Sequence, residues 1–273
     1  MSVIRTVKKW VKKTPLKIIY WKLLEILRLV QPFRLSEGGF YFKGSAEMVH
    51  GTYEPIIKDF VIQSARSTKN LVNIGANSGY FPCIAANAGY QKVIAVEPNK
   101  INYKILNLNI SKNKFFNVQT IQAACSANTG IANLWGRNTG ASLLDGWEGN
   151  PTTGVVRVKT LTLDSIFESI PKNETTLTII DVEGFEFEVM KGSTNILNDW
   201  RNVTWIVEIS LWRDINGVRT LAPYLSEIFT KFLNAGYRAH ACSEGWPLIS
   251  NEELDKYIKG SIDWPALPFL FKR

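Results

Sequence analysis

The chain has 273 residues, a formal net charge of +8, and a composition that is 45% apolar and 21% charged. This length suits one large α/β domain with extensions, and the composition excludes a disordered or low-complexity chain. The three cysteines are scattered, with none in a Cys-x-x-Cys arrangement, which excludes a disulfide framework and gives no indication of a zinc site. We therefore expect a reducing, cytoplasmic compartment.

The positive charge is concentrated at the N-terminus. Residues 1–30 contain eight lysines and arginines and one acid, which leaves a net charge of only about +1 for the rest of the chain. Because the remainder is nearly neutral and carries no aromatic-basic RNA-binding motif, we expect no nucleic-acid partner.

Residues 1–30 also have the pattern of basic amphipathic helices, with four apolar residues on one helical face: Val3, Val7, Trp10 and Val11. No apolar run reaches the ~18 residues that cross a bilayer, and no small-residue cleavage site of a secretory signal follows. Two interpretations remain open. The segment lies on an anionic membrane surface, at the inner face of the membrane, or it packs on the domain with its lysines solvated.

Residues 71–98 predict a strand, a glycine turn, a helix and a second strand. Leu71 to Ile74 are apolar, Gly75 begins the turn, and Glu97 ends the second apolar run. The free N–H groups at the start of such a helix bind negatively charged ligand groups. An acid about 20 positions further on is placed to accept hydrogen bonds from a ribose diol. The pattern therefore predicts a nucleoside-cofactor site.

The glycine spacing indicates which nucleoside. Gly75 and Gly79 are four residues apart, and Ala76 stands where a dinucleotide motif has the glycine that admits the pyrophosphate. A single nucleoside with an amino-acid tail fits better, and S-adenosylmethionine has that shape. A nicotinamide-dependent oxidoreductase and a tight turn without a ligand remain as alternatives.

Apolar runs alternate with helical patterns along the rest of the chain. We expect helices over 51–65, 99–112, 185–191 and 221–235, strands over 118–124, 177–181 and 203–209, and closing strands in the C-terminal tail. Residues 126–160 are rich in Gly, Asn and Thr and predict a β-rich excursion. The alternation indicates an α/β fold with a doubly wound, mainly parallel sheet that binds ligands at the carboxyl ends of its strands. We place this domain at 41–273, after a basic helical extension at 1–40.

Five segments carry a family resemblance: GTYEP (51–55), VNIGANSGYF (72–81), VIAVEPN (93–99), LTLDSIF (161–167) and IIDVEGFEFEVMKGS (179–193). In order and spacing they resemble the FkbM-type methyltransferases, a branch of the class I S-adenosylmethionine-dependent enzymes. The resemblance covers about residues 50–210 and excludes the first 40. Two positions depart from it: Asn73 stands where many members have Asp, and Cys125-Ser126-Ala127 stands where a Ser-Asp pair often follows.

The resemblance implies S-adenosylmethionine as cofactor and a methyl acceptor that is a hydroxyl of a glycan, a lipid-linked sugar or a secondary metabolite. It implies a cofactor site drawn from nine residues: Glu54, Asn73, Gly75, Ala76, Asn77, Gly79, Glu97, Ala124 and Asp181. A non-catalytic, membrane-docking protein with a vestigial pocket is the alternative from a different class.

Three residues are candidates for a catalytic role: Asp181, Glu183 and His50. Asp181 ends a predicted strand, at the depth where reacting groups of such sheets lie, and either it or Glu183 would contact the acceptor hydroxyl or the cationic end of the cofactor. As an alternative, Glu183 and Glu186 cap the next helix. His50 precedes the GTYEP segment and would line the acceptor pocket. Asp181, Glu183 and Glu208 offer oxygen ligands for Mg²⁺, but we expect no metal.

Overall fold

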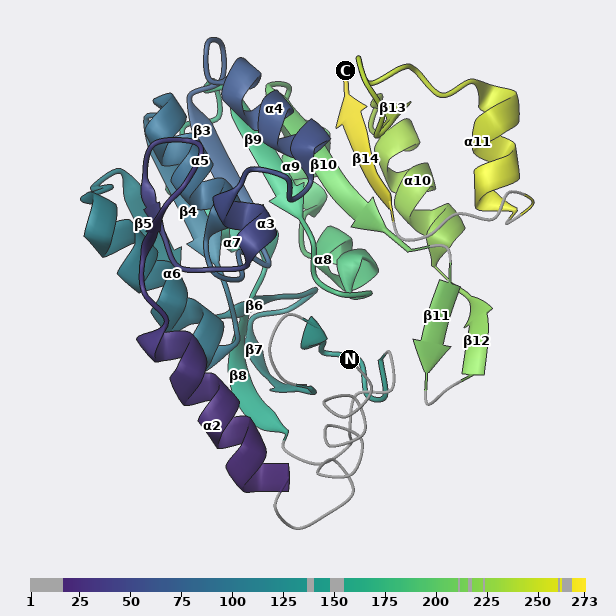
Figure 1. Cartoon of the computed structure of the whole chain (residues 1–273). Helices are drawn as coiled ribbons and strands as arrows, with labels where there is room; N and C mark the ends of the chain where they lie inside the picture. The colour runs from purple at the N-terminus through teal and green to yellow at the C-terminus, as the bar shows by residue number, and fades with distance from the viewer. Residues whose placement is uncertain are drawn as a thin grey trace.

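A seven-stranded sheet forms the centre of the molecule (Figure 1). The computed structural model describes residues 17–136, 140–147, 155–210, 212–215, 218–222, 224–259, 261 and 267–273, so the amphipathic pattern of residues 3–13 lies outside the described residues. The strand order is β13-β14-β10-β9-β3-β4-β5. The strands are β3 (Asn70–Ile74), β4 (Lys92–Val96), β5 (Val118–Ile121), β9 (Thr176–Ile180), β10 (Val203–Ile209), β13 (Arg238–Ala241) and β14 (Leu267–Lys272).

The sheet is mainly parallel, as the sequence predicts. β5, β4, β3, β9 and β10 pair in parallel, whereas β14 runs antiparallel to both β10 and β13. β3 lies between β4 and β9, because the chain leaves β3 toward β4 and β5 and returns to the other side of β3 through β9. This reversal creates a crevice at the carboxyl ends of β3 and β9, which is where open α/β sheets bind ligands.

Helices cover both faces of the sheet. Successive strand residues point to opposite faces, so Leu71 and Ile179 pack in one apolar layer while Val72 and Ile180 pack in the other. The first layer contains α4 (Pro55–Ser64), α5 (Tyr80–Ala88) and α6 (Lys100–Asn113). The second contains α7 (Leu163–Phe167), α8 (Glu186–Lys191), α9 (Thr194–Asp199), α10 (Leu225–Asn234) and α11 (Asn251–Ile258). The doubly wound arrangement is therefore confirmed.

A small second sheet follows β5. It has the order β6-β8-β7 and consists of β6 (Ala124–Cys125), β7 (Gly130–Leu134) and β8 (Val156–Leu161). The β-rich excursion is confirmed for its described residues, but the expectation of a single strand over 118–124 was wrong. This segment divides at a turn, in which the Ala123 N–H donates to the Ile121 carbonyl at 3.1 Å, and β6 then pairs with β8.

Other element boundaries also differ from expectation. The helix expected over 51–65 begins at Pro55, because Gly51 and Glu54 have left-handed backbone torsions, with φ of 66° and 42°; a short helix, α3 (Ala46–Val49), precedes it. The helix expected over 221–235 begins at Leu225, after an unexpected hairpin of β11 (Trp212–Ile215) and β12 (Val218–Leu221). α11 was likewise not expected.

The first described helix, α2 (Lys17–Val30), meets α6 with its C-terminal end (Figure 1), where an Arg28 Nη2–H donates to Asn102 Oδ1 at 2.9 Å. A hairpin of β1 (Arg34–Leu35) and β2 (Tyr41–Phe42) follows, and a domain boundary after residue 40 would fall inside it. The Lys43 N–H joins the hairpin to α6 by donating to Asn109 Oδ1 at 2.8 Å.

The outer face of α2 is apolar. Four residues at helical spacing are about half exposed or more: Leu23, Ile26, Leu27 and Val30. Within the described ranges, no helix is long and apolar enough to cross a bilayer.

Candidate functional site

A cavity of about 360 Å³ opens at the crevice where β3, β4 and β9 end. We call it the switch-point cavity. Five of the predicted cofactor residues line it: Gly75, Asn77, Glu97, Ala124 and Asp181. Glu54, Asn73, Ala76 and Gly79 are not among its lining residues, and of these Asn73 and Ala76 are buried. Further lining residues that the motifs did not indicate come from the α3 region and the β-excursion: Ser45, Glu47, Met48, Leu134, Ala141 and Leu143.

The glycine turn requires glycine for steric reasons. Gly75 has φ +82°, and a Cβ at this position would lie 1.7 Å from the carbonyl oxygen of Asp181. β3 and β9 pair in register up to Ile74 and Ile180, and the Asp181 N–H donates to the Ile74 carbonyl at 3.0 Å. The missing side chain therefore lets the two strand ends approach each other directly beneath the cavity.

Glu97 is a buried carboxyl held by backbone donors. Its Oε2 accepts the Asn77 N–H and its Oε1 accepts the Asn99 N–H, each at 2.8 Å. Burial raises the pKa of Glu97 to about 7, although these hydrogen bonds, Asn102 and the positive charge of Arg28 act in the opposite direction. Because Glu97 is fixed in the wall of the cavity, its remaining acceptor capacity is available to a ligand hydroxyl.

The Asp-Val-Glu-Gly segment forms a tight turn after β9. Glu183 and Gly184 both have positive φ, at 55° and 87°, and the ring of Trp147 packs where a Cβ of Gly184 would lie. Glu186 Oε1 accepts the N–H groups of Val182 and Gly184 at 3.3 and 3.1 Å. Glu186 thus holds the turn, in accord with the capping alternative, whereas Glu183 lines the cavity.

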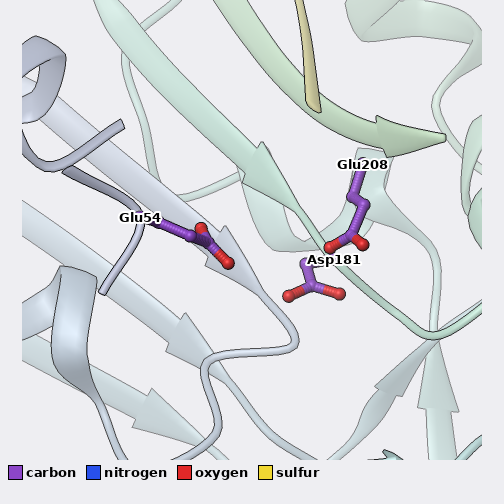
Figure 2. Close-up of side chains that lie close together, drawn as sticks. All are labelled: Glu54, Asp181 and Glu208. Atoms are coloured by element: carbon purple, nitrogen blue, oxygen red, sulfur yellow. The ribbon is translucent and has the colours of Figure 1, made fainter. Parts of the chain in front are cut away.

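Three carboxyl groups converge where Asp181 lines the cavity. Glu54, Asp181 and Glu208 have ligand atoms that all lie within 4.8 Å of one another (Figure 2). They come from distant segments: Glu54 precedes α4, Asp181 follows β9, and Glu208 lies in β10. Glu183, which the sequence grouped with Asp181 and Glu208 as oxygen donors, is not in this group, and Glu54 takes its place.

The carboxyl group of Asp181 holds its proton unusually tightly. Burial raises its pKa well above the ordinary value, and the negative charges of Glu208 and Glu54 raise it further. Burial raises the pKa of Glu208 to about 7, while the hydrogen bond from Asp181 lowers it. The two carboxyl groups are hydrogen-bonded to each other, which requires that one of them carries a proton. Burial raises the pKa of Glu54, whose carboxyl group accepts a hydrogen bond from the Tyr53 hydroxyl.

The two histidines lie apart from these groups. His50 is exposed at the C-terminal end of α3 and is not among the lining residues of the switch-point cavity. His240 lies in β13, with Nδ1 at 2.8 Å from the Trp246 carbonyl oxygen. The structure therefore brings Asp181 and Glu183 to the cavity but does not bring His50 there.

The far end of the cavity is apolar. Pro98, Ala123, Cys125 and Leu134 line it together with Ala124. Burial raises the pKa of the Cys125 thiol to about 12. Glu97 lines the same cavity.

The sequence of the chain identifies its family. Residues 73–239 match the family described as the methyltransferase FkbM domain. The chain belongs to the methyltransferase FkbM domain family. This family membership confirms the resemblance inferred from the five sequence segments.

Two kinds of relatives were found. The chain is 29% identical over 161 residues to the hexuronic acid methyltransferase AglP of Haloferax volcanii, a match that covers 59% of this chain and 64% of that protein. It thus spans less than two thirds of that relative. Among solved structures, methyltransferase FkbM from Methylobacillus flagellatus KT is 12% identical with a TM-score of 0.46, covering 84% of this chain and 55% of that one. Precorrin-6y C5,15-methyltransferase from Geobacter metallireducens GS-15 is 11% identical with a TM-score of 0.43, covering 85% and 95%.

Proposed function

We propose that this FkbM-domain methyltransferase uses S-adenosylmethionine to methylate a hydroxyl of a sugar, in a glycan or a lipid-linked saccharide, or of a secondary metabolite. One observation carries the proposal. Glu97 at the end of β4 and Asp181 at the end of β9 face one cavity, with the Gly75 turn of β3 between them.

The lining residues fit the cofactor part by part. Glu97 would accept hydrogen bonds from the ribose diol, and the apolar end around Ala124 would receive the adenine. Glu183, which also lines the cavity, would face the cationic amino-acid end. The Cβ-free position at Gly75 supports the fit, because it keeps the turn between these two ends narrow. Bound S-adenosylmethionine supplies a methyl group on a positively charged sulfur, which needs no further activation.

The chain has two tasks in the reaction. The walls of the cavity hold the acceptor hydroxyl in line and keep water out, and such positioning contributes up to ~7–11 kcal/mol. Asp181, which lines the cavity and is hydrogen-bonded to Glu208, would accept the hydroxyl proton at a carboxylate oxygen, the proton of the pair having passed to solvent before the acceptor closes the cavity. A positioned base of this kind contributes ~10²–10⁴-fold.

The sugar class of the acceptor is supported by the relative that is named a hexuronic acid methyltransferase. The nearly neutral body of the chain also argues against a nucleic-acid acceptor.

Isothermal titration of the full chain with S-adenosylmethionine and its demethylated product tests the cofactor. We expect binding by the wild type and at least tenfold weaker binding by Glu97→Gln, which keeps the shape but loses acceptor strength. Absence of binding at high protein concentration contradicts the proposal, and tight binding of NADH instead would favour the oxidoreductase alternative.

Transfer of a radiolabelled methyl group to uronic-acid glycans tests the hydroxyl assignment. A methyl ether on a hydroxyl survives mild alkali, whereas a methyl ester on a uronic carboxyl is hydrolysed to methanol. Alkali-stable label is the expected result. Alkali-labile label would show that the acceptor is the carboxyl group.

A further inference from the structure

A second, basic cavity adjoins the switch-point cavity. It measures about 500 Å³ and lies between α2, the segment after the β1–β2 hairpin and the turn before α5. The two cavities share Ser45, Met48 and Asn77. Three cationic side chains and no carboxyl group line the basic cavity; the cations are Arg28, Arg34 and Lys43.

Two of these cations lack a negative partner. The charge of Arg28 is opposed by Glu97 and Glu25. Within the described part of the chain, no ion pair joins Arg34 or Lys43 to a carboxylate. The Arg34 Nε–H is buried without a hydrogen-bond partner, and its Nη2 donates only to the Gly44 carbonyl at 3.0 Å. The partners of these two groups are therefore dipoles and not charges.

Lys43 is the more deeply placed of the two. It is 5% exposed, its Nζ donates to the Leu29 carbonyl at 2.6 Å, and its charge lies 4.8 Å from the centre of the Phe33 ring. Burial lowers the pKa of Lys43. An ammonium group that is partly removed from water without a counterion is destabilising, because part of its hydration is lost and a carbonyl dipole and a ring replace it only in part. Such an arrangement persists readily where an anion completes it.

We propose that the basic cavity binds the phosphate group of a phosphorylated ligand. Two cations without a carboxylate partner, with Arg28 lining the same cavity, match a multiply charged anion with several acceptor oxygens better than a single carboxylate, and guanidinium groups suit phosphate geometry. The volume also exceeds what one free ion requires. The phosphate belongs either to a soluble or acceptor-linked phosphorylated molecule or to the headgroup of a membrane lipid.

Thermal unfolding of the full chain with inorganic pyrophosphate as the probe tests the site without S-adenosylmethionine, so failure here is separate from failure of the proposed methyl transfer. For the wild type we expect the Tm to rise by roughly 5–10 °C at a hundred times the Kd. Arg34→Gln and Lys43→Met should bind at least tenfold more weakly. The matched control is Lys172→Gln. This exposed lysine precedes β9, at the amino-terminal ends of the parallel strands and away from the cavity, and its variant should retain the full rise in Tm.

The variants also separate a binding role from a structural one. Lys43→Met removes an uncompensated charge at similar volume, so its Tm without pyrophosphate should equal or exceed that of the wild type. Arg34 is less buried, so Arg34→Gln supplies the same test if Lys43→Met does not fold. A Tm rise that is absent in the wild type, or equal in all four proteins, overturns the proposal.

Vesicles distinguish the two sources of phosphate. If the lipid headgroup is the ligand, Arg34→Gln and Lys43→Met lose binding to phosphatidylglycerol vesicles as well as to pyrophosphate. If the ligand is a soluble or acceptor-linked phosphate, the variants lose only pyrophosphate binding. Loss of vesicle binding with unchanged pyrophosphate binding contradicts a defined phosphate site.

Discussion

Gly75 is the residue whose replacement should be least tolerated. Gly75→Ala places a methyl group 1.7 Å from the Asp181 carbonyl oxygen and forces a left-handed torsion on Ala. We expect a loss of about 3–5 kcal/mol in the free energy of unfolding, of which the torsion accounts for ~1–2. Urea unfolding measures the loss of stability, and cofactor titration measures the effect of the substitution on the cavity above the turn.

Gly89→Ala is the matched control for Gly75→Ala. Gly89 has φ +99° at the end of α5, with nothing within 4 Å of its would-be Cβ. It therefore carries the same torsional strain without the collision, and a loss of only ~1–2 kcal/mol is expected. Equal losses at the two positions would show that the close approach of β3 to Asp181 is not what selects glycine.

The Asp181–Glu208 pair predicts a distinct kinetic response. Asp181→Asn should lower kcat by ~10²–10⁴-fold with a small change in KM, because the amide accepts no proton. Glu208→Gln removes the negative charge that raises the pKa of Asp181. The acid limb of the pH–rate profile should therefore move to lower pH in this variant. An acid limb that does not move would exclude Asp181 as the group that titrates.

The position of Glu97 and Asp181 at the carboxyl edge of the sheet could be predicted from the sequence. Each follows an apolar run, and parallel strands end at one edge of the sheet. The spatial proximity of Glu54 and Glu208 could not be predicted from the sequence. It depends on the left-handed torsion at Glu54 and on the pairing of β10 with β9, and both are set by tertiary contacts between distant segments. The exposed position of His50 follows likewise from the turn that ends α3.

At the scale of elements, sequence patterns located β3, β4, β9, β10 and α6 closely, because each is a clear apolar run or begins with a capping residue such as Asn99. The division of the strand at Ile121 was not foreseeable, since residues 118–124 are uniformly suited to a strand and only the pairing of β6 with β8 separates them. The β11–β12 hairpin has a similar origin, because its four-residue strands are too short for a visible period.

Membrane binding by the basic residues 1–30 remains a prediction, and the exposed face of α2 allows it to be tested. Its stripe of Leu23, Ile26, Leu27 and Val30 is exposed, and residues 1–30 are strongly basic. If this face lies on an anionic bilayer, Leu23→Ser with Ile26→Ser should reduce sedimentation with phosphatidylglycerol vesicles at least tenfold, with binding weakened by salt. The control is Ile131→Ser, an equally exposed apolar residue on β7. Loss of stability instead of vesicle binding would indicate that the stripe packs against protein.

The whole molecule should be less stable at pH 8 than at pH 5. Burial raises the pKa values of Glu97, Glu186 and Glu208 from 4.5 to about 7. Between these values the folded state binds more protons than the unfolded state, so stability falls as pH rises through that window, by up to about 3 kcal/mol for one such group. His240 opposes this trend, because burial lowers its pKa.

Urea unfolding midpoints measured from pH 4.5 to 8 without cofactor would show this slope. Glu186→Gln keeps an oxygen that accepts the Val182 and Gly184 N–H groups but cannot ionise, so its slope should be shallower than that of the wild type. A midpoint that is constant or rises between pH 5 and 8 contradicts the expectation.

The buried thiol of Cys125 bears on how the protein would tolerate the methyl donor proposed for the cavity. A methyl donor is an alkylating agent, and the thiolate is the form of cysteine that such agents attack. Cys125 lines the proposed adenine end, yet burial raises its pKa to about 12, so almost none of it is thiolate at neutral pH. If the proposed cofactor binds there, the protonated thiol would protect the protein from methylating itself, and electrophilic inhibitors aimed at this cysteine should react slowly.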